Sequence, residues 1–96
     1  PVQPSISPTS GAPGSQFTIT DPQGRMVAGD VALFYVEGTD PLMGTAAATV
    51  TVSADGTTLS ASVPTGLSPN VQHYVSVRPS MTLPGRFNDL AFFVTP

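Results

Sequence analysis

Cysteine, tryptophan and lysine are all missing from this chain of 96 residues, and only 9% of its side chains are charged. The absence of cysteine excludes a disulfide framework, a thiolate zinc site and a cysteine nucleophile. Three arginines stand against six carboxylates, which gives a formal net charge of −3. A chain with so few cations neutralises few phosphates, so its composition argues against nucleic acid or an anionic membrane as a partner.

Long apolar runs are also missing. The longest uninterrupted run, residues 31–36, has the length of a strand, whereas a membrane-spanning helix needs about 18 apolar residues or more. The start of the chain carries no positive charge followed by an apolar stretch, as a secretion signal would. We therefore expect no direct insertion into a membrane, and we interpret the chain, which begins at Pro1, as a segment of a larger protein.

The residues that are abundant indicate an all-β domain. Eleven prolines and nine glycines are spread along the chain, and 40% of the residues are apolar. Apolar residues that alternate with polar ones predict half-buried strands, and Asp55-Gly56 between two such runs predicts a hairpin turn. The strands that we expect cover residues 4–8, 14–20, 31–36, 49–54, 57–63, 71–78 and 90–95.

Seven short strands in one domain leave two architectures, a two-sheet sandwich or a small barrel, and we favour the sandwich. Residues 4–8 are bounded by prolines, which is typical of an edge strand. Residues 31–36 and 90–95 are apolar on both faces. These two strands are therefore expected either to be covered on both sides or to lie where a neighbouring module packs.

The segment from Ile6 to Thr20, Ile-Ser-Pro-Thr-Ser-Gly-Ala-Pro-Gly-Ser-Gln-Phe-Thr-Ile-Thr, resembles the opening of IPT/TIG domains, which are immunoglobulin-like modules. Gly11 and Gly14 occupy the two turn positions of that opening, and residues 31–38 and 74–77 are compatible with later strands. The resemblance implies a seven-stranded antiparallel β-sandwich of the immunoglobulin-like E-set type, here without a disulfide. The loop of residues 21–26 departs from the family pattern, so its geometry is not carried over.

The resemblance also implies a function, namely a non-catalytic structural spacer and protein-interaction module of an extracellular or surface-exposed, bacterial protein. Its partners would be neighbouring domains of the same polypeptide or another surface protein. A carbohydrate-binding accessory module of a secreted polysaccharide-active enzyme is the alternative. The DNA-binding role of some family members is disfavoured by the acidic charge balance.

Catalysis and metal binding find little support in the sequence. His73 is the only histidine, and its phase with Val75 and Val77 predicts that it points inward at the rim of the core. The six carboxylates are scattered singly, whereas calcium needs six to eight ligands at one point. We therefore predict no catalytic residue, no metal site and no cofactor.

A sandwich of alternating strands would bring all three arginines to one end, beside soft apolar side chains of the kind enriched at interfaces. The candidate interaction surface consists of Arg25, Met26, Arg78, Met81, Arg86 and Phe87. One interpretation is a docking surface for a protein or an acidic glycan. The other is internal ion pairing with nearby aspartates or contact with a preceding module.

Two further sets of apolar residues carry alternative interpretations. Tyr35, Tyr74 and Phe93 are candidate glycan-facing aromatics, because aromatic rings stack on sugars, but strand aromatics also serve packing. Leu42 and Met43 fall at the end opposite the arginines. They are expected either to tuck under the sandwich or to contact a following module.

Overall fold

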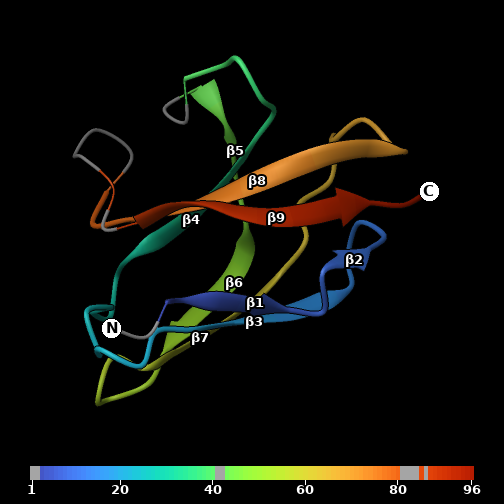
Figure 1. Cartoon of the computed structure of the whole chain (residues 1–96). Helices are drawn as coiled ribbons and strands as arrows, with labels where there is room; N and C mark the ends of the chain where they lie inside the picture. The colour runs from blue at the N-terminus through green and yellow to red at the C-terminus, as the bar shows by residue number, and fades with distance from the viewer. Residues whose placement is uncertain (1–2, 41–42, 81–84, 86) are drawn as a thin grey trace.

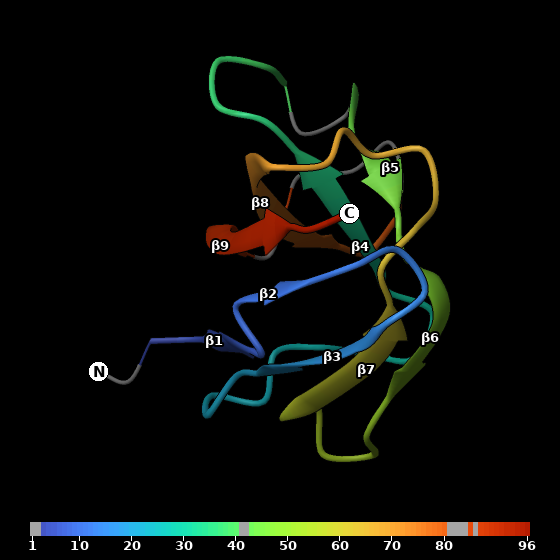
Figure 2. The same ribbon diagram turned by 90° about the vertical axis from the view of Figure 1, so that its right-hand side faces the viewer.

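Two β-sheets face each other and enclose one apolar core, so the chain is an all-β sandwich (Figure 1). The structure, a computed structural model, describes residues 3–40, 43–80, 85 and 87–96. None of these residues lies in an α-helix. Figure 2 shows the two layers from the side, with the short strand β2 between the level of one sheet and that of the other.

The first sheet is antiparallel and has the order β1-β3-β7-β6. Its strands are β1 (Ser5–Ser7), β3 (Gln16–Thr20), β7 (Thr58–Ser62) and β6 (Ala48–Val52). Phe17 and Ile19 alternate with polar residues in β3 and are buried, as are Leu59 and Ala61 in β7. This period of two places the apolar side chains on the core face and the hydroxyl side chains on the outer face.

The second sheet has the order β2-β9-β8-β4-β5. Its strands are β2 (Ser10–Gly11), β9 (Phe87–Val94), β8 (Val71–Arg78), β4 (Val31–Tyr35) and β5 (Thr45–Ala46). All pairs are antiparallel except β2 with β9, which is parallel. The chain therefore leaves the first sheet after β1, contributes β2 to the second sheet, and returns to the first as β3.

The part of the chain that the structure describes contains nine strands, where the sequence predicts seven. The two additional strands, β2 and β5, have two residues each, and so short a segment gives no alternation that could reveal it. The predicted hairpin is confirmed, because β6 and β7 pair in antiparallel register on either side of Asp55-Gly56. The predicted edge strand is also confirmed, since β1 lies at the edge of its sheet.

Strand β4 is buried on both faces. Ala32 and Phe34 point to the core, and Leu33 and Tyr35 on the outer face are buried as well. This confirms the first of the two expectations for residues 31–36. In β9 only the core face is fully buried, and Phe93 on the outer face remains partly exposed.

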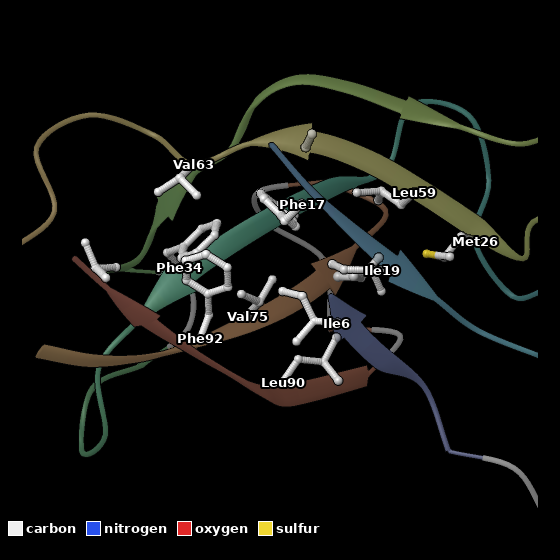
Figure 3. Packing of buried hydrophobic residues seen from close by; sticks show 14 residues of the cluster. Ile6, Phe17, Ile19, Met26, Phe34, Leu59, Val63, Val75, Leu90 and Phe92 are labelled. Carbon is white, nitrogen blue, oxygen red and sulfur yellow. The ribbon is translucent and has the colours of Figure 1, made fainter. Parts of the chain in front are cut away.

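Three phenylalanines from three strands form the centre of the core (Figure 3). The ring of Phe34 meets those of Phe17 and Phe92 in T-shaped arrangements, with centroid distances of 5.4 and 5.5 Å. Such aromatic pairs contribute about 0.5–1.5 kcal/mol beyond the burial of their area. Because Phe17 belongs to one sheet and the other two rings to the second, this cluster holds the sheets together.

The strand directions gather the loops at two opposite ends of the sandwich (Figure 1). The Arg25 end comprises loops 21–30 and 53–57 and the end of β8; the His73 end comprises loops 12–15, 36–40 and 63–70 and the start of β8. β1 begins at the Arg25 end, because Ser5 pairs with Thr20, and β9 finishes at the His73 end, because Val94 pairs with Val71. The first strand thus begins at one end of the sandwich and the last strand finishes at the other.

Candidate functional site

The loop that follows β3 is organised around the buried carboxylate of Asp21. This carboxylate accepts hydrogen bonds from the backbone amides of Gln23, at 3.1 Å, and Arg25, at 3.0 Å. The Arg25 guanidinium donates to it as well, from Nε at 2.9 Å and from Nη2 at 3.3 Å. Burial raises the pKa of Asp21, but the hydrogen bonds and the charge of Arg25 and the amide of Gln23 outweigh burial and lower it below 3.8.

Arg25 is held by internal contacts on two sides. Its guanidinium pairs with Asp21 and also lies over the ring of Phe87, 5.1 Å from the centroid, which is within the range of a cation–π contact. Its side chain is 38% exposed. The structure thus brings Arg25 and Phe87 together as the sequence predicts, and internal ion pairing describes Arg25.

Met26 and Arg78 do not contribute to an exposed surface, although the sequence places both in the candidate interaction surface. Met26 is only 2% exposed and lies in the core, because the loop of residues 21–26 folds back against the hairpin, where the Met26 amide donates to the Gly56 carbonyl. Arg78 is 6% exposed, and its Nε donates to the hydroxyl of Ser76. Met81 and Arg86 lie outside the described residues.

Tyr35, the first of the three candidate glycan-facing aromatics, is buried and serves an internal clamp. Its hydroxyl donates to Oδ1 of Asp89 at 2.5 Å and accepts from the Asp89 amide at 2.9 Å. Since β8 lies between β4 and β9, this pair of hydrogen bonds bridges the central strand of the sheet. Asp89 has a φ of 67° at an irregularity in the β8–β9 register, so the clamp fixes an unusual backbone conformation. Burial, together with the Asp89 carboxylate, raises the pKa of Tyr35 to about 12.

Tyr74 and Phe93 lie on the outer face of the second sheet and are both partly exposed. Tyr74 pairs with Ala91, two residues before Phe93, so the two aromatic side chains are diagonal neighbours on adjacent strands. Gln72, opposite Phe93, is exposed and completes this patch. Of the three candidate aromatics, these two remain accessible to a ligand.

His73 is buried, with 3% exposed, and projects from β8 on the core face as predicted. Its Nδ1 lies 2.9 Å from the carbonyl oxygen of Val71, which can only accept, so Nδ1 is the donor. The ring therefore presents Nε2 as its other polar atom. No group of three or more metal-ligating side chains occurs anywhere in the described part of the chain.

A pocket of about 210 Å³ opens at the His73 end between the loop that follows β4 and the loop that precedes β8. His73 and Phe34 contribute to its wall from the core side, and Leu67 contributes from the loop before β8. Met43 also lines the pocket and is 81% exposed, so it does not tuck under the sandwich. Leu42, for which the sequence gives the same two expectations, lies outside the residues that the structure describes.

The outer face of the first sheet is polar without charge. In one row across its four strands lie Ser7, Thr18, Ser60 and Thr51, as the register shows. A hollow of about 170 Å³ on this sheet is lined by Gln16, Thr49, Thr51, Ser60 and Ala61. The alternation of hydroxyl and apolar residues in the sequence indicates the composition of this face, but not the hollow, which adjoins a bulge in β6.

The sequence does not reveal the residues that shape the site most directly. In the sequence, Asp21 precedes a proline, and a turn is enough to explain it. In the structure, Asp21 organises the whole loop by accepting hydrogen bonds from Arg25. The four-residue spacing of Asp21 and Arg25 is the only feature of the sequence that indicates this pair. Asp89 is an isolated carboxylate in the sequence, and only the structure shows Tyr35 beside it.

No helix among the described residues is long and apolar enough to cross a membrane.

No protein-family model matches this chain, and no curated protein matches it either. The class that the fold defines is therefore the architecture itself, an all-β sandwich in which the described strands form one sheet of four and one of five.

Proposed function

We propose that this chain is an immunoglobulin-like E-set module of IPT/TIG type that acts as a non-catalytic spacer and protein-contact domain of an extracellular or cell-surface, bacterial protein. The observation that carries the proposal is the direction of the first and last strands along the chain, since β1 begins at one end of the sandwich and β9 finishes at the other. A module built in this way holds the domains joined to its two ends apart. The longest dimension of the module is 33 Å.

The loops support the proposal because they are held in fixed conformations. At the Arg25 end, the backbone of Gly24 lies close to that of Gly56. Beside this contact, the amide of Met26 donates to the carbonyl of Gly56 at 3.2 Å. The buried carboxylate of Asp21 holds the same loop in place by accepting a hydrogen bond from the Arg25 amide. Preformed loops lose little conformational entropy when a partner binds, which suits contact between modules.

Rigid spacing is measurable with a pair of spin labels. Because the chain has no native cysteine, Gln3→Cys and Thr95→Cys give two unique attachment points near the two ends. We expect one narrow distribution of distances, of the same order as the 33 Å long dimension. Labels at Thr20→Cys and Thr51→Cys, both within the first sheet, give the reference width. A distribution several times broader than this reference would contradict a rigid spacer.

A carbohydrate-binding module is the second candidate, and the partly exposed pair Tyr74 and Phe93 favours it. A sugar ring would stack on these side chains, and Gln72 beside them, whose Nε2 donates to the His73 carbonyl, would supply its amide oxygen as an acceptor. Native gels cast with neutral polysaccharides would show retardation of the wild type and its loss in Tyr74→Ala and Phe93→Ala. Thr51→Ala, on the opposite sheet, is the control, and equal migration of all four proteins would remove this candidate.

A further inference from the structure

The pocket at the His73 end has the size of a single side chain. Its volume is about 210 Å³, whereas an apolar cavity of about 150 Å³ already accommodates a benzene molecule. A leucine or phenylalanine side chain therefore fits, and a folded domain or a long ligand does not.

The wall of this pocket combines apolar surface with a few polar groups. Val36, Met43 and Leu67 supply apolar side chains to the lining, and Thr39 and Ser68 supply hydroxyls, of which that of Thr39 donates to the Val36 carbonyl. The inner wall contains the buried His73, whose Nδ1 is engaged with the Val71 carbonyl. Binding pockets are typically lined by apolar walls with a few fixed polar groups, and this pocket shares that kind of lining at a smaller volume.

The charges beside the pocket are all negative. Glu37 and Asp40 are exposed on the loop that follows β4. The loops of the His73 end, residues 12–15, 36–40 and 63–70, contain no arginine, and the chain contains no lysine. The field at this end therefore favours a cation next to whatever enters the pocket.

We propose that the pocket at the His73 end docks a polypeptide segment of a partner that inserts one leucine- or phenylalanine-sized side chain flanked by lysine or arginine. The apolar side chain is the anchor, in contact with Leu67 and Met43, and Glu37 attracts the flanking cation. Anchors seated in a pocket typically carry most of the energy of an interface, while exposed charges at the rim add selectivity. This inference rests on the proposed protein-contact function and specifies the chemistry of the partner.

A second copy of the chain is the weaker occupant. Head-to-tail stacking would bring the Arg25 end of one copy to the pocket of another, and Val27, 54% exposed on a tight turn, would be its anchor. That end carries more aspartates than arginines, however, and Arg25 is already paired with Asp21. Two acidic ends would meet, which opposes self-association.

Blocked synthetic peptides test the proposal without knowledge of the natural partner. The probes are Gly-Lys-Leu-Lys-Gly, Gly-Lys-Ser-Lys-Gly and Gly-Glu-Leu-Glu-Gly, titrated into labelled protein while the amide NMR signals are followed. We expect the Lys-Leu-Lys peptide to shift the signals of Thr39, Gly44, Gly66 and Leu67 saturably. The peptides that lack the anchor or carry the opposite charge should shift them at least several times less.

Matched variants assign the effect to the pocket. Ser68→Phe places a ring at the pocket and should abolish saturable binding, whereas Thr65→Phe, in the same loop but outside the pocket lining, should retain it. Glu37→Gln should weaken binding about two- to fivefold, the range of an exposed charge pair. A dispersed NMR spectrum shows that Ser68→Phe is folded, and the Gly-Lys-Ser-Lys-Gly peptide tests the anchor without any substitution in the protein.

Three results would overturn the proposal. These are equal shifts with the Glu-Leu-Glu peptide, full binding by Ser68→Phe, and concentration-dependent dimerisation that moves the pocket signals in the absence of any peptide. The last result would identify a second copy as the occupant. None of them affects the spin-label distance between residues 3 and 95, so failure of this inference and failure of the spacer function are distinguished.

Discussion

The hydroxyl of Tyr35 makes two hydrogen bonds to the same residue, one to the Asp89 carboxylate and one from its amide. Asp21 similarly collects four hydrogen bonds from Gln23 and Arg25. Within the described residues, no buried side-chain nitrogen or oxygen lacks a partner. The chain has few charged side chains. Tyr35 and Asp21 therefore form hydrogen bonds within the protein, and they hold backbone segments outside the apolar core in place.

Tyr35→Phe is expected to remove the clamp while preserving the ring. The loss of two hydrogen bonds should lower the free energy of unfolding by about 1–2 kcal/mol. The pKa of Tyr35 in the folded chain, about 12, lies above the ordinary value of 10.0. The stabilisation is thus complete below pH 10 and is lost as the pH rises from 10 to 12. Urea unfolding at pH 8 and pH 11 checks this, and an unchanged decline in Tyr35→Phe would contradict it.

Asp21→Asn is expected to destabilise the chain by about 1–3 kcal/mol at neutral pH, because the amide brings a donor toward the donors of Arg25 and Gln23. The pKa of Asp21 in the folded chain lies below 3.8, so its contribution is present above pH 4 and is lost as the pH falls further. Chemical unfolding at pH 7 and pH 3 should show a smaller acid-induced loss in the variant than in the wild type. Thr51→Ala, which removes no ionisable group, is the control, because its acid-induced loss should equal that of the wild type.

The hairpin between β6 and β7 and the loop after β3 form one unit at the scale of structural elements. Gly56 has a φ of 75°, and a Cβ atom added to it would lie 2.4 Å from the carbonyl oxygens of both Gly24 and Met26. Two backbone segments thus meet where no side chain fits. This contact joins the turn of the first sheet to the loop that leads into the second.

Gly56→Ala should therefore lower the free energy of unfolding by more than the unfavourable backbone conformation alone would. A left-handed residue other than glycine costs about 1–3 kcal/mol, and here the added methyl group also displaces two carbonyls. Gly38→Ala is the matched control, because its φ is 85° but nothing lies within 4 Å of the added atom. Thermal unfolding of the two variants should place Gly56→Ala clearly below Gly38→Ala. Equal melting temperatures would show that the close approach carries no energy.

Period-two alternation predicts the long strands well, because it depends on which face each side chain occupies. The pattern of β8, for example, predicts both its extent and the inward direction of His73. Alternation says nothing about pairing over a distance, so the parallel contact of β2 with β9 could not be predicted. The start of β9 at Phe87 was also missed, because the register irregularity at Asp89 interrupts the pattern.

The candidate surface was predicted less well than the strands. The sequence brings Arg25 near Phe87 through topology alone, and the structure agrees. It could not show that Met26 turns into the core, because a loop has no periodicity that distinguishes buried from exposed positions. For Tyr35 the sequence leaves a glycan-facing and a packing role open, and the structure shows the packing role, because its burial depends on what covers β4 from outside.

The core is the feature that unites the whole molecule. Phe34→Ala removes the ring that contacts both Phe17 and Phe92 and should cost about 3–5 kcal/mol. Since domains are stable by about 5–15 kcal/mol in total, this single change is expected to leave a marginal fold. Phe93→Ala, on the partly exposed face, should cost far less. Urea unfolding of both variants makes the comparison, and similar midpoints would contradict a core centred on Phe34.

The parallel pairing of β2 with β9 acquires a mechanical meaning when the two ends of the chain are drawn apart. The amide of Phe93 donates to Thr9 and that of Thr95 donates to Gly11, each at 2.9 Å. A pull on the segment before β1 and on the segment after β9 drags these strands in opposite directions along their own axes. The bonds between them lie across that direction, so they are loaded together in shear and not broken one after another. A module joined in this way yields to tension in one cooperative step, at a force set by a seam of only a few residues.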